Sequence, residues 1–146
     1  MEIREINQGD ESLVHRHWEI GRDAEAAYRP YDFYVQWETA WTSYQVGRED
    51  LRFVLLGAFD GDTMVGAGRT DVNLLDNLHS ASSMIFVDPA RPIPWRCRAL
   101  DAACVEVARA EGRRLLMTEA FAPPGATPPG CCSPARWATR RGSRTA

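Results

Sequence analysis

The residues whose types are best suited to binding a ligand lie in an arginine-rich loop. Between Pro89 and Ala99 the chain reads Ala-Arg-Pro-Ile-Pro-Trp-Arg-Cys-Arg, and this loop joins an apolar strand pattern to a helical pattern. A loop that enters a helix presents free backbone N–H groups and the positive end of the helix dipole. The loop is therefore a candidate site for a phosphate or pyrophosphate, although Pro92 and Pro94 remove two N–H donors.

Other residues that often do chemistry do not form a metal-binding or disulfide pattern. His15 and His17 are two positions apart, so on a helix their side chains diverge and do not grip one metal ion. We expect solvent-facing or packed histidines. None of the four cysteines has a Cys-x-x-Cys spacing, which argues against zinc and against a disulfide framework. The sequence predicts no metal site.

The elements that flank the arginine-rich loop form a strand–helix–strand unit. An apolar strand is predicted at Ser83–Val87 and a helix near Ala99–Glu111. Gly112 suits the left-handed position after a helix, and Arg114–Glu119 is predicted to be the second strand. A unit of this length joins two parallel strands, which we expect to be neighbours in one sheet.

The helix in this unit has one apolar face, from which its burial can be predicted. Its residues Leu100, Cys104 and Val107 or Ala108 recur at helical spacing. We expect Leu100, Cys104 and Val107 to be buried and Glu106, Arg109 and Arg113 to be exposed.

The first half of the chain predicts one strand followed by two helices. Glu2–Ile6 alternates charged and apolar residues, and Asp10 or Ser12 then caps a helix that runs to about Tyr28, with Leu13, Val14 and Trp18 on its inner side. A second helix carries the stripe Tyr34, Trp37, Trp41 and Tyr44. This stripe is more often part of a core than a ligand-binding wall, and both interpretations stay open.

A hairpin is predicted next. Arg52–Asp60 is a strongly apolar strand, Asp60-Gly61 is the turn, and Thr63–Leu74 is the returning strand. Gly66 and Gly68 indicate a bulge or close backbone packing, because a dinucleotide loop needs a third glycine and opens a helix. His79 is expected to be a surface turn residue.

Several of these segments resemble the GNAT family of N-acetyltransferases. The resemblance covers roughly residues 1–130, with an affinity to members that have tandem domains. It rests on Val87-Asp88-Pro89 at the end of a strand, Arg98-Ala99-Leu100 at the start of a helix, Glu111-Gly112-Arg113-Arg114 at its end, and the loop Ala122-Pro123-Pro124-Gly125. The resemblance implies an α/β fold with a mixed sheet in the order β-α-α-β-β-β-α-β. It also implies acetyl transfer from acetyl-CoA to a primary amine of a small molecule or peptide.

The resemblance also implies roles for particular residues. Main-chain groups near Phe86 and Val87 would hold the pantetheine arm of acetyl-CoA, and Tyr31 and Tyr34 would line the acceptor site. Glu119 would be the base, although a surface glutamate at a strand end is an equally good interpretation. The diphosphate would lie on the arginine-rich loop, at Arg91, Pro92, Trp95, Arg96, Cys97 and Arg98.

The chain departs from the family pattern in two places. The signature Gln/Arg-x-x-Gly-x-Gly/Ala is missing, and Trp95 and Cys97 stand where the family has small residues. Read one base forward, the codons for Pro92–Arg98 admit that signature. Read one base back, Cys131–Thr139 admits Leu-Leu-Leu-Ala-Arg-Ala-Met-Gly-Tyr, which resembles the last helix of the family. We infer two local shifts of reading frame, in the gene or in its reading. They leave the last helix and final hairpin missing or replaced.

Composition predicts one domain with a separate tail. The 146 residues are 45% hydrophobic and 25% charged, which is typical of a globular domain. Residues 131–146 hold four arginines and no acidic residue, whereas residues 1–130 hold 13 arginines and 20 acidic residues. We expect a domain at 1–130 and a disordered tail at 131–146, in a cytoplasmic protein that binds neither nucleic acid nor membrane. Two alternatives remain: a non-catalytic remnant that binds CoA or a small ligand, and a nucleotide-binding α/β module.

Overall fold

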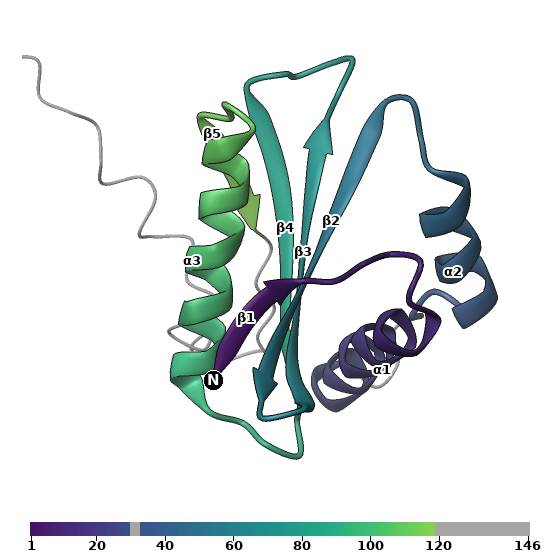
Figure 1. Ribbon diagram of the computed structural model, residues 1–146, viewed down its shortest axis with the longest axis vertical. Helices are drawn as coiled ribbons and strands as arrows, with labels where there is room; N and C mark the ends of the chain where they lie inside the picture. Colours follow the sequence, from purple (N-terminus) through teal and green to yellow (C-terminus); the bar gives the residue numbers. More distant parts are fainter. Residues whose placement is uncertain (30–32, 119–146) are drawn as a thin grey trace, which may run out of the picture.

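The computed structural model describes residues 1–29 and 33–118, which form five strands and three helices (Figure 1). The elements are β1 (Glu2–Glu5), α1 (Glu11–Tyr28), α2 (Trp37–Val46), β2 (Leu51–Asp60), β3 (Thr63–Asn73), β4 (Ser80–Val87), α3 (Pro94–Ala110) and β5 (Leu115–Thr118). This order confirms the predicted β-α-α-β-β-β-α-β arrangement. The predictions for Tyr31, Glu119 and the tail 131–146 concern residues outside the described ranges.

The strands form one mixed sheet in the order β1-β2-β3-β4-β5. The first three pairs of neighbours are antiparallel, and β4 and β5 are parallel. Ser80 is paired with Leu115 and Ser83 with Thr118, so the two strands of the predicted strand–helix–strand unit are adjacent and parallel. That prediction is confirmed.

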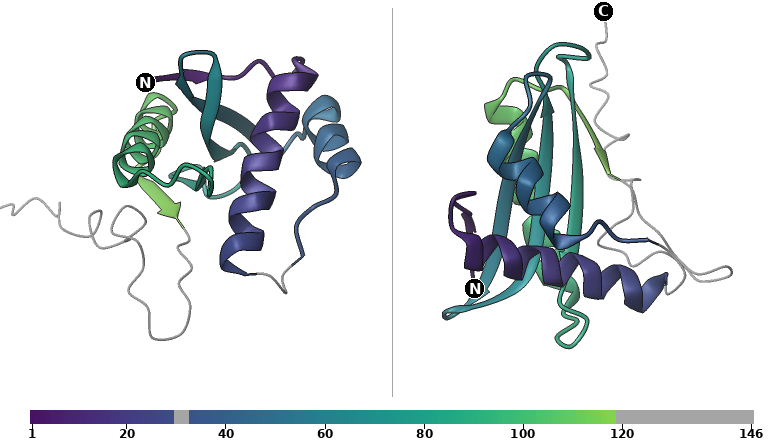
Figure 2. Two further views of the ribbon diagram at one scale, coloured as in Figure 1. Left: turned by 90° about the horizontal axis from the view of Figure 1, so that it is seen from below. Right: turned by 90° about the vertical axis from the view of Figure 1, so that its right-hand side faces the viewer.

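Helices cover the sheet on both faces (Figures 1 and 2). Helices α1 and α2 pack on one face and α3 on the other. The side chains of β2 enter two different cores in alternation, because successive side chains of a strand point to opposite faces of the sheet. Leu55 and Phe59 pack under α1, whereas Val54, Leu56 and Ala58 pack under α3.

The β2–β3 hairpin contains both features that its glycines predict. Its turn residue Gly61 has φ 60°. Ala58 is paired with Gly66 but Phe59 with Met64, so β3 has one extra residue at this point, a β-bulge. A Cβ at Gly66 would lie 2.8 Å from Leu100 Cδ1 of α3, so the glycine also permits close helix packing.

Helix α1 begins where its cap predicts. Asp10 is the N-cap, and its carboxylate accepts a hydrogen bond from the Leu13 backbone N–H at 3.1 Å. Val14 is fully buried, and Leu13 and Trp18 are half-buried on the same inner side. Helix α2 begins at Trp37, so Tyr34 precedes the helix that it was expected to share with Trp37.

Helix α3 begins five residues earlier than predicted, at Pro94 and not at Ala99. The reason is that proline fits the first turn of a helix, where its missing N–H would be unpaired in any case. Most of the supposed loop is therefore helical. At the other end, Gly112 has φ 70°, as its position after the helix predicts.

The predicted burial of α3 is largely correct. Leu100 and Cys104 are fully buried and Val107 is half-buried, while Glu106 and Arg109 are exposed. The expectation for Arg113 is wrong, because this side chain is half-buried.

Arg113 lies after the helix, so helical phase does not control its exposure. Its guanidinium donates a hydrogen bond to the Leu78 carbonyl in the β3–β4 loop. The residue therefore fixes the end of α3 to that loop instead of pointing into solvent.

Strand β5 carries apolar side chains on an uncovered surface. Leu115 is 44% and Met117 51% exposed, whereas Leu116 between them is buried under α3. The described part of this strand therefore exposes apolar surface on one face. No helix among the described residues is long and apolar enough to cross a membrane.

Candidate functional site

The candidate site begins at the C-terminal half of β4. Its backbone pairs with β3 through Val87, opposite Gly66. On the other side, pairing with β5 ends at Ser83 and Thr118 in the part of the chain that the structure describes. An unpaired strand edge can accept an extended ligand as an added strand would. Phe86 and Val87 are both half-buried at this edge.

The loop after β4 is held in place by Asp88. Its carboxylate accepts hydrogen bonds from the Ala90 backbone N–H at 3.0 Å and from Arg16 Nη2 of α1 at 2.8 Å. Its backbone N–H donates to the Val65 carbonyl at 3.1 Å, and its carbonyl accepts from the Arg91 N–H at 2.8 Å. The loop is therefore tied to both α1 and β3.

The start of α3 combines positive charge with few free N–H groups. Ile93 is the N-cap and makes no side-chain capping hydrogen bond. Pro94 has no N–H, and the Arg96 N–H donates to the Ile93 carbonyl at 3.0 Å. Arg91 and Arg98 are exposed beside this helix end. Their charges and the helix dipole suit a diphosphate.

Arg96 does not point toward solvent. Its side chain is buried, and Nη2 forms an ion pair with Asp60 Oδ2 of the β2–β3 turn at 3.0 Å. Nη1 donates to the Arg91 carbonyl at 3.1 Å, and Nε is buried without a hydrogen-bond partner. The charge of Arg96 therefore holds the loop against the β2–β3 turn.

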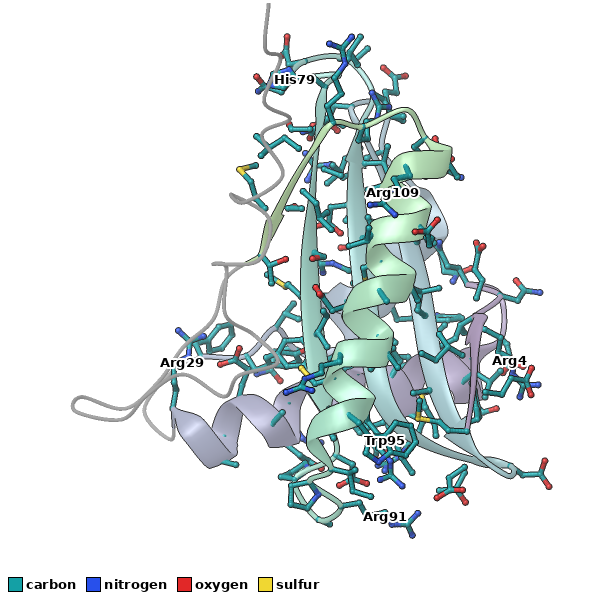
Figure 3. All side chains as sticks on the ribbon, turned by 90° about the vertical axis from the view of Figure 1, so that its left-hand side faces the viewer. Arg4, Arg29, His79, Arg91, Trp95 and Arg109 are labelled. Atoms are coloured by element: carbon teal, nitrogen blue, oxygen red, sulfur yellow. The ribbon has the colours of Figure 1, made fainter. Side chains whose placement is uncertain are left out.

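The two remaining candidate side chains at the start of α3, an indole and a thiol, differ in exposure. Trp95 is 51% exposed, and Cys97 is buried. Figure 3 shows Arg91 and Trp95 together at this end of α3. Of the residues expected at the diphosphate, the structure thus leaves Arg91, Pro92, Trp95 and Arg98 exposed, and it buries the Arg96 and Cys97 side chains. Their contact with a ligand stays a prediction.

Tyr34 lies on the opposite side of β4 from α3. Its ring meets the Phe86 ring edge-on, with the centroids 6.4 Å apart. The Trp18 ring of α1 lies at 6.2 Å. Burial raises the pKa of Tyr34 to about 12. Tyr34 and Phe86, which were named for different parts of the site, are therefore neighbours.

Strand β3 carries an ion pair that the sequence patterns above do not predict. Arg69 Nε lies 2.7 Å from Asp71 Oδ1, and Arg69 Nη2 donates to Asp71 Oδ2 at 2.8 Å. The guanidinium also lies over the Phe53 ring, 5.3 Å from its centroid. Burial raises the pKa of Asp71, while Arg69 opposes that rise. The available signal was two opposite charges at i and i+2 of a strand, which share one face.

The histidines of α1 have different environments. Buried His17 places Nε2 2.9 Å from the Gly68 carbonyl, and burial lowers its pKa to about 4. Half-buried His15 lies 3.7 Å from Glu19 and packs edge-on against Trp37. No group of three potential metal ligands occurs within residues 1–29 and 33–118.

No protein-family model and no curated protein sequence matches the chain, but solved structures do. The yncA protein of Salmonella typhimurium, solved with its cofactor acetyl-CoA, has a TM-score of 0.63 and 20% identity, over 81% of this chain and 68% of that chain. A tandem GNAT protein from the clavulanic acid biosynthesis pathway has a TM-score of 0.68 and 24% identity, over 94% of this chain and 42% of that chain.

A third match is a ribosomal-protein-alanine N-acetyltransferase from Brucella melitensis, with a TM-score of 0.61 and 20% identity, over 81% of this chain and 73% of that chain. The chain has the GNAT fold. The expected resemblance is thereby confirmed, together with the mixed sheet. The chain spans less than half of the tandem GNAT protein, at 42% of its length.

Proposed function

We propose that this GNAT-fold chain is an acyltransferase domain that moves an acetyl group from acetyl-CoA to a primary amine. The observation that supports the proposal is the edge of β4 beyond Ser83, which no described residue pairs with and which leads into the arginine-flanked start of α3. An extended arm fits the edge, and a diphosphate fits the charge at the helix start. We assign the domain to residues 1–130.

Acetyl-CoA would supply the activated acetyl group, and the residues of this chain would bind and orient it. Backbone groups of Phe86 and Val87 would pair with the pantetheine arm. Arg91 and Arg98 would neutralise the diphosphate. Because the Tyr34 ring contacts Phe86, an amine bound beside Tyr34 would be close to an acetyl group held at this edge.

The amine must lose a proton before it attacks, and we propose Glu119 as the base that takes it. Glu119 follows Thr118, the last residue of β5, in the chain. Direct transfer needs no Ser-His-Asp triad. The acceptor would be a small-molecule or peptide amine, and Tyr31 and Tyr34 would line its site.

Calorimetric titration with acetyl-CoA, NAD and ATP tests the binding part of this proposal. We expect heat of binding with acetyl-CoA alone. Binding of NAD or ATP in its place would favour a nucleotide-binding module. The catalytic part is tested by release of free CoA thiol with a panel of primary amines, using Glu119→Gln beside the unchanged chain. Turnover that is the same in both would remove Glu119 from the mechanism.

A second candidate function is a non-catalytic remnant that binds CoA or a small ligand. The observation that favours it is the start of α3, where two prolines and an inward-turned Arg96 leave few donors for the diphosphate. Acetyl-CoA binding without turnover of any amine in the panel would support this alternative.

A further inference from the structure

Arg96 is a buried cation in the first turn of α3. Its side chain is only 6% exposed, and Nη2 lies 3.0 Å from Asp60 Oδ2. Nη1 donates to the Arg91 carbonyl at 3.1 Å, and the Trp95 ring lies 6.0 Å from the guanidinium carbon. A cation with so little exposure must be paired. The Asp60 carboxylate is the charge that compensates it.

Asp60 is a surface residue, in contrast to the arginine with which it pairs. It is the last residue of β2, and its side chain is 61% exposed. A carboxylate near an anion-binding site repels the anion, so this charge by itself would weaken the binding of a diphosphate. The contact with Arg96 gives Asp60 a different role.

The contacts of Arg96 continue into the loop after β4. The Arg91 N–H donates to the Asp88 carbonyl at 2.8 Å, and the Asp88 carboxylate accepts from Arg16 of α1, also at 2.8 Å. The loop is therefore held near one end by Arg16 and near the other by Arg96. Arg91 is held through its backbone, and its side chain is exposed. Asp60 orients the arginine that fixes this backbone.

We propose that Asp60 is a positioning residue for the diphosphate of acetyl-CoA. It acts through Arg96, which holds the Arg91 backbone beside the start of α3, and it does not touch the ligand. The inference rests on the proposed function, in which Arg91 and Arg98 neutralise the diphosphate. A binding group that is already fixed loses less conformational entropy when the ligand binds, so the affinity depends on this restraint.

The positioning role and the simple effect of charge predict opposite results when Asp60 is replaced. If Asp60 positions the loop, Asp60→Ala releases Arg96, and we expect the Kd for acetyl-CoA to rise at least about fivefold. Asp60→Asn keeps an oxygen that can accept from Arg96, so its Kd should rise less. If only charge matters, both variants bind acetyl-CoA more tightly than the unchanged chain and to the same extent.

Calorimetric titration with acetyl-CoA measures these changes, and Asp62→Ala is the matched control. Asp62 is an exposed acidic residue of the same turn. Its replacement removes one negative charge there but keeps the pair of Asp60 with Arg96. We expect this variant to bind acetyl-CoA as well as the unchanged chain or slightly more tightly.

General loosening of the fold is the competing structural explanation, and a donor without the diphosphate separates the two. S-acetylpantetheine carries the acetyl group and the arm alone. We expect Asp60→Ala to lower kcat/KM for acetyl-CoA at least about fivefold and to leave kcat/KM for S-acetylpantetheine unchanged, whereas loosening lowers both. Circular dichroism and a melting curve confirm that the variant is folded, and the milder Asp60→Asn serves if it is not.

Equal or tighter binding of acetyl-CoA by folded Asp60→Ala would overturn the inference and leave the proposed function intact. An equal loss of kcat/KM with both donors would also overturn it, because the effect would not concern the diphosphate. Failure of the unchanged chain to bind acetyl-CoA at all would overturn the proposed function itself.

Discussion

His17 shows how the environment of a single residue makes stability depend on pH. Its pKa is about 4 in the folded chain and 6.5 in an unfolded one, so the unfolded state takes up a proton first as the pH falls. The contribution of His17 to the unfolding free energy is therefore fully present above pH 6.5 and is lost as the pH falls toward 4. We expect this residue to account for a loss of about 3 kcal/mol across that range.

Urea unfolding at a series of pH values measures this effect, and His17→Gln is the control. Glutamine can still donate a hydrogen bond to the Gly68 carbonyl but does not titrate. Below pH 6.5 the unfolding free energy of the variant should change less with pH. Parallel curves for the two proteins would show that His17 is not responsible.

Gly66 is a second residue on which stability depends, because there is no room for a Cβ atom at this position. An added Cβ would lie 2.8 Å from Leu100 Cδ1 and 3.4 Å from the Phe86 carbonyl oxygen. We expect Gly66→Ala to lower the unfolding free energy by about 1–3 kcal/mol, the usual cost of overpacking. Gly9→Ala, at an exposed position, is the comparison and should change it much less. An equally stable Gly66→Ala protein would show that α3 can move away from β3.

At the scale of elements, two arginines at the start of α3 are expected to have different roles, one in stability and one in ligand binding. Arg96 is buried against Asp60, while Arg98 is exposed. We expect Arg96→Gln to lower the unfolding free energy by about 1–2 kcal/mol. Arg98→Gln should leave it within about 0.5 kcal/mol but weaken acetyl-CoA binding severalfold, most strongly at low salt.

Thermal melts and calorimetric titration of both variants test this division. Arg96→Gln should lower the melting temperature, whereas Arg98→Gln should mainly weaken acetyl-CoA binding. If Arg98→Gln bound acetyl-CoA as well as the unchanged chain at low salt, the diphosphate would have to lie elsewhere.

Strand β5 presents different surfaces on its two faces. Met117 is half-exposed, whereas Leu116 is buried under α3. Met117→Thr should leave the unfolding free energy nearly unchanged and reduce self-association, because threonine keeps the strand preference and removes apolar surface. Leu116→Thr should cost about 2 kcal/mol or more. Light scattering and urea unfolding check both expectations, and a large stability loss in Met117→Thr would mean that this face is covered.

At the scale of the whole molecule, the two inferred frame shifts should limit both stability and activity. Residues 131–146 contain Trp137 as their only large apolar side chain, so their composition offers little apolar area for burial. Each 100 Å² of lost apolar burial costs about 2.5 kcal/mol, against a total stability of about 5–15 kcal/mol. A version of the chain with both frames restored should melt at a higher temperature and bind acetyl-CoA more tightly.

The direct comparison is acetyltransfer by the two versions under the same conditions. We expect the restored version to turn over faster. Equal turnover would falsify the frame-shift account and leave an intact enzyme with an unusual loop.

The sequence alone determined the order of elements, the parallel pairing of β4 with β5, and the buried face of α3. These features depend on local spacing: a strand–helix–strand length, an Asp-Gly turn, and apolar residues at helical intervals. The same local signals narrowed the cap of α1 to Asp10 or Ser12 and identified Gly112 as a helix end. They also pointed to the loop after Pro89 as a site for an anion.

Only the tertiary structure decided which polar side chains face inward. The inward turn of Arg96 and the contact of Tyr34 with Gly21 and Phe86 each join elements that local periodicity does not relate. Such contacts depend on how strands are aligned and how closely helices approach them, because burial and charge are properties of the packed chain. Sequence spacing sets the elements, whereas packing sets the chemistry of the side chains between them.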